Sequence, residues 1–150
     1  MLGPAYVFDD VHILKSEYAC QCCGKLPPDI YKNIYYHTFF QKWERIRSAW
    51  KRPVPISKNG GWRCPRLVYL MIIEKRARAA VSPHSFWALD SDLDSKRETE
   101  EYAKLSIDLY PELRIGYKGY IEERMSFVHL DQAYEIQPRA SESWVEEFRF

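Results

Sequence analysis

Large apolar residues recur at steps of three or four between Asp29 and about Lys51 of this 150-residue chain. This spacing is typical of one face of a helix, and Asp29 can cap its N-terminus. We therefore expect a long helix here that supplies much of the core. Its apolar stripe consists of Tyr31, Tyr35, Phe39, Trp43, Ile46 and Trp50.

Two further helices are predicted downstream. The segment RLVYLMIIEKRARAA should form one that begins near Pro65, because proline is tolerated in a first helical turn. Ser95 and Glu98 have the spacing of a capping box, which predicts another helix that ends by Pro111. The apolar face of this last helix would carry Tyr102, Leu105 and Leu109.

Strand patterns occupy the remaining segments. LRIGYKGY and SFVHLDQAYEI are rich in β-branched and aromatic residues, and the charged IEERM between them predicts a loop. RPVPIS is interpreted as a short edge strand, with KNGG as a turn after it. We expect Trp144 and Phe148 to dock as one last helical turn. The pattern predicts an α+β fold in one domain, with a core at about 16–137 and a tail at 138–150.

Charge and composition restrict the class of partner. The 22 Lys and Arg are interspersed with 21 Asp and Glu, so the net charge is only +1. A broad basic surface, which duplex nucleic acid requires, is not expected. The N-terminus lacks the pattern of a signal peptide, and no segment resembles a membrane span. We expect a monomer without a nucleic-acid or membrane partner.

Four cysteines leave three interpretations open. Cys20, Cys22 and Cys23 lie together in ACQCCGK, and Cys64 follows in GWRCP. They can be free thiols in a reducing compartment, form one or two disulfides, or hold a structural Zn²⁺ ion. None of these interpretations identifies a function.

Two segments combine histidine with aspartate. In SPHSFWALDSDLD, His84 precedes Asp90, Asp92 and Asp94, which share one face if the segment is a strand. In SFVHLD, His129 shares a strand face with Asp131. Burying such groups is unfavourable unless they pair or bind an ion, and two histidines with one carboxylate are a common catalytic zinc set. A structural pair and a solvated acidic ladder remain the alternatives. The other two histidines, His12 and His37, are expected to be structural.

Four motifs resemble one family. SEYACQCCG, GGWRCP, SPHSFWALDSD and SFVHLD occur in the order of the landmarks of the zinc D-alanyl-D-alanine carboxypeptidase family, which includes murein endopeptidases of bacteriophages. The resemblance spans about 16–131. It implies a small antiparallel sheet, packed with helices, that carries a Zn²⁺ ion bound by His84 and His129. The third ligand would be Asp90, if ALD matches the family's Ala-x-Asp, or Asp92, if DLD does.

The resemblance also implies catalytic roles. Arg63 matches an arginine thought to steady the active-site loop or to polarise a substrate carbonyl or carboxylate. Many relatives carry a proton-transferring Glu or His just before the last ligand, where this chain has Ser126 and Phe127. Asp131 and Glu123, with its neighbour Glu122, are the candidates to take that role. Asp131 can instead orient the zinc ligand His129.

The implied function is zinc-dependent hydrolysis of amide bonds in peptidoglycan stem peptides, as a carboxypeptidase or an endolysin-type endopeptidase of a phage. Such a protein would be made in the host cytoplasm or carried on a virion and would act on the cell wall. One alternative is a non-catalytic relative that serves as a wall-binding or virion structural protein. Another is a cysteine-based zinc module that binds a protein or nucleic-acid partner.

Overall fold

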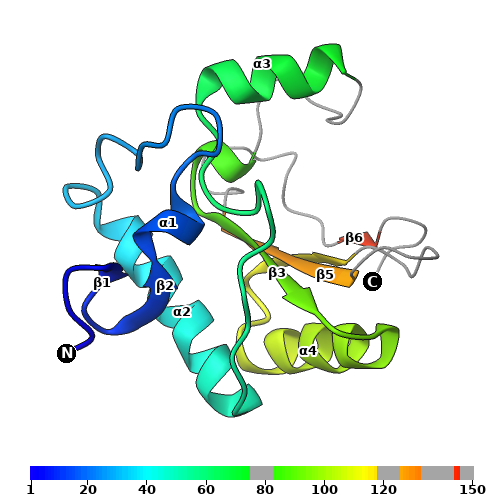
Figure 1. Cartoon of the computed structure of the whole chain (residues 1–150). Helices are drawn as coiled ribbons and strands as arrows, with labels where there is room; N and C mark the ends of the chain where they lie inside the picture. The colour runs from blue at the N-terminus through cyan, green and yellow to red at the C-terminus, as the bar shows by residue number, and fades with distance from the viewer. Residues whose placement is uncertain (75–82, 118–125, 133–143, 146–150) are drawn as a thin grey trace.

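The computed structural model describes residues 1–74, 83–117, 126–132 and 144–145 (Figure 1). Helices and small sheets are combined in one α+β arrangement, as the sequence predicts. In chain order the elements are β1 (Tyr6–Phe8), β2 (Val11–Leu14), α1 (Lys15–Tyr18), α2 (Ile34–Trp50), α3 (Pro65–Ile73), the 3₁₀ turn η1 (Pro83–Ser85), β3 (Ala88–Leu93), α4 (Lys96–Leu109), β4 (Arg114–Tyr117), β5 (Ser126–Asp131) and β6 (Trp144–Val145).

The larger sheet has the strand order β3-β5-β4-β6. Its central strand, β5, pairs antiparallel with both β3 and β4. The short β6 adds to β4 in the parallel direction. The prediction of a final helical turn is therefore wrong for Trp144, whose backbone completes a sheet edge. Phe148, the second residue of that prediction, lies outside the described residues.

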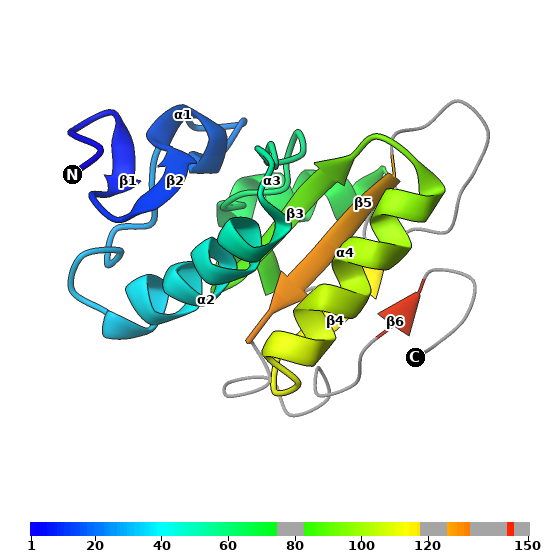
Figure 2. The ribbon, with the colours of Figure 1, turned by 90° about the horizontal axis from the view of Figure 1, so that it is seen from below.

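The sheet has one apolar face, which α2 and α4 cover (Figure 2). Alternate residues of a strand point to opposite faces, so every second residue of β3 and β5 contributes to the main core. Ser91 also faces the helices, where its hydroxyl oxygen accepts a hydrogen bond from the Trp43 indole N–H at 3.1 Å. The residues that alternate with the core residues form the opposite face of both strands. The strand residues in the core are Leu89, Leu93, Val128 and Leu130.

Helix boundaries follow local capping. Helix α2 begins four residues later than the predicted cap implies, because the Asn33 side chain accepts the Tyr35 N–H at 3.0 Å. Asp29 instead begins a turn, in which its carbonyl accepts the N–H groups of Lys32 and Asn33. The predicted starts of α3 at Pro65 and of α4 after Ser95 are confirmed.

Helix α4 ends at Leu109, as expected from Pro111. Its Ser95 hydroxyl accepts the Glu98 N–H, as in a capping box. The Glu98 carboxylate, however, accepts the N–H of Asp94 rather than that of Ser95. The reciprocal bond of the predicted box is therefore displaced by one residue.

The first 14 residues form a hairpin that the hydrophobic pattern did not reveal. β1 and β2 pair antiparallel, and Val7, Val11 and Ile13 are buried in the main core. The predicted strand RPVPIS is reduced to one bridge, between Ile56 and Ser91, because its prolines cannot donate ladder hydrogen bonds. The loop predicted at IEERM and the end of RLVYLMIIEKRARAA fall outside the described residues.

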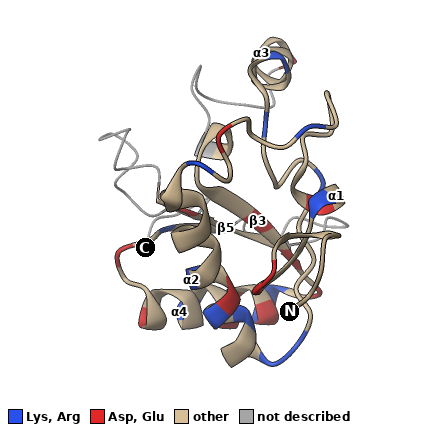
Figure 3. Ribbon diagram, turned by 90° about the vertical axis from the view of Figure 1, so that its left-hand side faces the viewer, with Lys and Arg blue, Asp and Glu red and all other residues tan. Residues whose placement is uncertain are grey.

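Charges of both signs follow the helices. Figure 3 shows Lys and Arg interspersed with Asp and Glu along α2 and α4. Examples are the ion pairs Arg47–Glu44 on α2 and Arg97–Glu101 on α4. Within the described part of the chain, no helix has the length and apolar character needed to span a bilayer.

Replacing Ser91 tests the alternation of β3. Ser91→Ala leaves the buried Trp43 N–H without its acceptor, so the free energy of unfolding should fall by about 1–3 kcal/mol. The exposed Ser48→Ala on α2 is the matched control and should change it by less than about 0.5 kcal/mol. Urea denaturation of both variants measures the difference, and equal stabilities would contradict the helix-facing placement of Ser91.

Candidate metal centre

The face of the sheet opposite the helices carries buried ionisable groups. Asp90 on β3 lies directly across from His129 on β5 in the strand register. Both alternate with core residues, so both point away from α2 and α4. Asp90 and His129 are nevertheless buried, at 6% and 3% exposure. This cross-strand pair is the base of the site.

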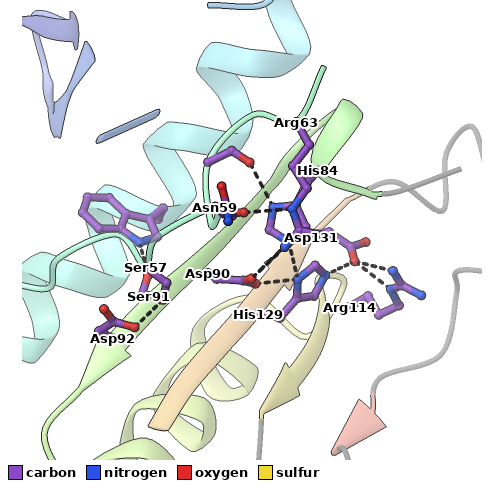
Figure 4. Close-up of polar contacts among 12 residues, drawn as sticks. Ser57, Asn59, Arg63, His84, Asp90, Ser91, Asp92, Arg114, His129 and Asp131 are labelled. Atoms are coloured by element: carbon purple, nitrogen blue, oxygen red, sulfur yellow. Dashed lines mark hydrogen bonds and ion pairs between the residues drawn. The ribbon is translucent and has the colours of Figure 1, made fainter. Parts of the chain in front are cut away.

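His84 joins the pair from the 3₁₀ turn η1 (Figure 4). Its Nε2 lies 3.2 Å from Asp90 Oδ2 and 3.2 Å from His129 Nδ1. His129 Nδ1 lies 2.8 Å from Asp90 Oδ1. A tetrahedral zinc ion with ordinary bond lengths holds its donor atoms about 3.3 Å apart. The three side chains therefore already approach the arrangement of a metal-binding triangle, and together they form a candidate metal site.

The outer nitrogen of each histidine has a partner that fixes the ring. His84 Nδ1 lies 3.1 Å from the Gly61 carbonyl oxygen, to which it donates. His129 Nε2 lies 2.5 Å from Asp131 Oδ2. When both outer nitrogens carry the hydrogen, the inner nitrogens present their lone pairs toward Asp90. Such partners orient histidine ligands in metal sites.

Asp131 lies behind His129 rather than beside the inner nitrogens. Arg114, directly across from it on β4, directs Nε and Nη2 to Asp131 Oδ2 at 2.7 and 2.6 Å. Asp131 is fully buried. The geometry thus favours the orienting role of Asp131 over the predicted catalytic one. Arg114 was not predicted as a site residue. The available signal was a single basic residue at the start of the strand RIGY.

The loop at 57–63 holds the ligands from the other side. The Asp90 N–H donates to the Gly60 carbonyl at 2.9 Å, and the Arg63 N–H donates to the His84 carbonyl at 3.0 Å. A Cβ atom on Gly60 would lie 2.8 Å from the Asp90 Cβ, and one on Gly61 would lie 2.4 Å from the Tyr18 carbonyl oxygen. The sequence pattern predicted only a turn here, but both glycines permit close approach of the loop to its neighbours.

Arg63 lies beside the candidate metal ligands. Its Nη2 is 3.6 Å from Asp90 Oδ2, and its Nε donates to the Asn59 carbonyl at 2.8 Å. The guanidinium therefore adds positive charge at the edge of the site.

Asp92, the alternative third ligand, does not join the group. Its carboxylate accepts a hydrogen bond from the Ser57 hydroxyl. Asp94 follows the end of β3 and is exposed. Glu122 and Glu123 lie outside the described residues. The structure therefore brings together His84, Asp90 and His129 from the predicted ligand set.

The remaining two histidines are paired elsewhere. His37 Nε2 lies 2.7 Å from Asp10 Oδ1, and His12 contacts the Glu44 carboxylate. Their expected structural roles agree with these contacts.

Electrostatics couple the three ligands. Burial lowers the pKa of His129, but hydrogen bonds to Asp131 and Asp90 and their charges outweigh it and raise the pKa to about 9. Burial lowers the pKa of His84. Burial raises the pKa of Asp90, but the two histidines outweigh this effect and the net shift is downward. In the metal-free chain, a proton on His129 balances the carboxylates, and a bound cation would replace that proton.

A second cluster involves sulfur. The thiols of Cys20, Cys23 and Cys64 lie within 4.8 Å of one another, and all four cysteines are free thiols. Burial raises the pKa of the Cys20 thiol, but hydrogen bonds from the backbone N–H groups of Cys64, Cys23 and Cys22 outweigh it, so the net shift is downward. The four cysteines form no disulfide in this structure, and the thiols of three of them lie together. Free thiols and a zinc site are the interpretations that agree with this arrangement.

Comparison of the chain with protein-family descriptions, curated proteins and solved structures found no match. Functional inference therefore depends on the geometry of the site and on the resemblance of its motifs.

Asp90 and Asp92 form a matched pair for testing the ligand set, because both lie on one face of β3. Asp90→Ala should lower bound metal by about one ion per chain, since it removes one of three protein ligands. Asp92→Ala should keep the ion. Elemental analysis of the purified chains measures the content. Loss in Asp92→Ala with retention in Asp90→Ala would reverse the assignment.

The proton on His129 should be observable in the metal-free chain. Its pKa is raised from 6.5 to about 9, so the stability it contributes is present below pH 6.5 and lost as pH rises through about 9. Asp131→Asn removes one stabilising charge and should lower this pKa. NMR titration of the imidazole in chelator-treated protein measures both values. A His129 pKa near 6.5 before the substitution would contradict the expectation.

Proposed function

We propose that the chain is a zinc-dependent peptidase that hydrolyses amide bonds in peptidoglycan stem peptides, as a carboxypeptidase or an endopeptidase. The observation that carries the proposal is the convergence of His84 Nε2, His129 Nδ1 and the Asp90 carboxylate, with both outer imidazole nitrogens engaged. The resemblance of the motifs to the D-alanyl-D-alanine carboxypeptidase family supports the substrate class.

The donor set fits Zn²⁺. Two imidazole nitrogens and one carboxylate leave a fourth tetrahedral position open, which is the usual arrangement of a catalytic zinc site. The same donor types also occur at non-haem Fe²⁺ sites, which place the ligands on one side of an octahedron. The resemblance of the motifs to a zinc-dependent family favours Zn²⁺ over Fe²⁺.

Bound zinc would supply Lewis-acid polarisation of the scissile carbonyl and would lower the pKa of a water molecule. The chain's own residues supply position and charge. Asp131 holds the His129 ring in place, and the Arg114 guanidinium holds Asp131. Arg63 offers a fixed positive charge, with a planar set of donors, to a substrate carbonyl or carboxylate.

The proton acceptor comes from outside the ligand set in this proposal. Asp131 is engaged by His129 and Arg114. Ser126 and Phe127 occupy the positions where relatives carry Glu or His. Glu123 thus remains the proposed acceptor.

The presence of Ser126 and Phe127 where relatives carry Glu or His favours a second candidate function. A chain without a proton acceptor could retain the metal site and bind the cell wall without cutting it, as a wall-binding or virion structural protein. For both candidates we propose a monomer that is located in the host cytoplasm or on a virion and that acts on the cell wall.

Hydrolysis of purified peptidoglycan tests the proposal. The wild type loaded with zinc should release new amino groups or free D-amino acids, and chelation should abolish the release. Arg63→Ala should reduce kcat/KM by roughly 100-fold, as does loss of one oxyanion-stabilising donor in other hydrolases. Arg63→Lys, which keeps the charge without the planar donors, should lose less.

Two outcomes separate the candidates. Sedimentation of the chain with peptidoglycan but no release of fragments, at full zinc content and over a range of pH, would support the non-catalytic function. Hydrolysis that persists in Asp90→Ala after chelation would rule out the metal centre as its source. Glu123→Gln, compared with the adjacent Glu122→Gln, tests the proposed proton acceptor.

A further inference from the structure

The cysteine cluster lies where the N-terminal segment meets the start of α3. Cys20 and Cys64 are buried, and they pack in a small apolar cluster with Leu67 and Met71. Cys23 is exposed at its edge. We propose that Cys20, Cys23 and Cys64 bind a structural Zn²⁺ ion, separate from the metal centre formed by His84, Asp90 and His129. The proposal is independent of the proposed peptidase activity.

The backbone between the first two cysteines forms a tight loop. Cys20 and Cys23 are separated by two residues, the shortest common spacing of zinc-binding cysteine pairs. Gly24 follows at φ 71°, a left-handed conformation that favours glycine. Its N–H donates to the Cys20 carbonyl at 2.7 Å, while the Cys20 N–H donates to the Lys25 carbonyl at 2.9 Å. The loop therefore places the thiols of Cys20 and Cys23 on one side.

Backbone N–H groups are directed at the sulfur atoms. Cys20 Sγ accepts the N–H groups of Cys22 and Cys64, each at 3.4 Å. Cys64 is the N-cap of α3, and its Sγ accepts the Leu67 N–H at 3.5 Å. N–H donors and the positive end of a helix both favour the thiolate, which is the form that binds metal.

The fold brings a third thiol to the first two. The pairing of the 20–24 loop with Cys64 brings a distant third thiol to within 4.8 Å of the first two. Cys23 is exposed, so in this proposal water supplies the fourth ligand. The neighbouring Cys22 is exposed, and its thiol interacts with Cys64 but lies outside the group of three. Its replacement therefore tests whether the ion needs a fourth thiol.

The proposed ion would join segments that support the other site. The Trp62 N–H donates to the Tyr18 carbonyl at 2.7 Å. Trp62 lies two residues before Cys64, and Tyr18 lies two residues before Cys20. Arg63, which contacts Asp90, lies between Trp62 and Cys64. A metal ion bound by the cysteines would therefore fix both ends of this contact.

The test uses the full chain with His84→Ala and His129→Ala together, so that only the cysteine site remains. We expect about one zinc per chain by elemental analysis. Adding Cys64→Ser should remove the ion, whereas adding Cys22→Ser should retain it. No zinc in the parent double variant, folded by circular dichroism, would overturn the proposal. Equal loss from Cys22→Ser and Cys64→Ser would overturn the assignment of the three ligands.

A measurement on the wild type covers the case in which the variants do not fold. X-ray absorption at the zinc edge should show sulfur neighbours at about 2.3 Å in addition to nitrogen or oxygen at about 2.0 Å. All four thiols should react with a thiol reagent in denaturant without reductant. Zinc with nitrogen and oxygen neighbours alone, or two thiols lost to a disulfide, would overturn the proposal.

Discussion

The register of β3 against β5 is the constraint on which the metal centre depends. It places Asp90 opposite His129 and, together with the register of β4, places Arg114 opposite Asp131. A slip by one residue would turn His129 toward the core beneath α2 and α4 and would expose its apolar neighbours on the other face. The apolar packing of Val128 and Leu130 therefore helps to fix the position of the ligands, in addition to their own hydrogen bonds.

Burial makes these side chains depend on one another. Two carboxylates, Asp90 and Asp131, flank His129 within a few ångströms. Arg114 compensates the outer carboxylate, and Arg63 approaches the inner one. Buried charges without such partners are strongly unfavourable, and removal of one partner leaves the other uncompensated. A divalent cation at the three inner donors would complete this balance of charge in place of the proton on His129.

The sequence was informative where one residue type decides a local feature, and less so where distant segments decide. Pro65 and Ser95 correctly located two helix starts, and the alternation around His129 correctly indicated a polar strand face. The choice between Asp90 and Asp92 could not be made, since both share that face and only pairing with β5 and contact with η1 separate them. Asn33 rather than Asp29 caps α2, because the Asn33 side chain accepts the Tyr35 N–H. Arg114 and the close approach of Gly60 depend on strands and loops far apart in the chain.

The candidate metal centre is also non-local in sequence. The contacts of His129 with Asp90 and His84 join residues 39 and 45 positions apart, and the contact between Cys64 and Cys20 spans 44. Contacts of this range cost loop-closure entropy, which the rest of the fold must offset. No short segment of the chain can therefore assemble either group of ligands by itself. A metal ion held there would bind the completed fold in preference to the unfolded chain and would stabilise it by mass action. The rate at which a chelator removes the ion would then report the rate at which the sheet opens.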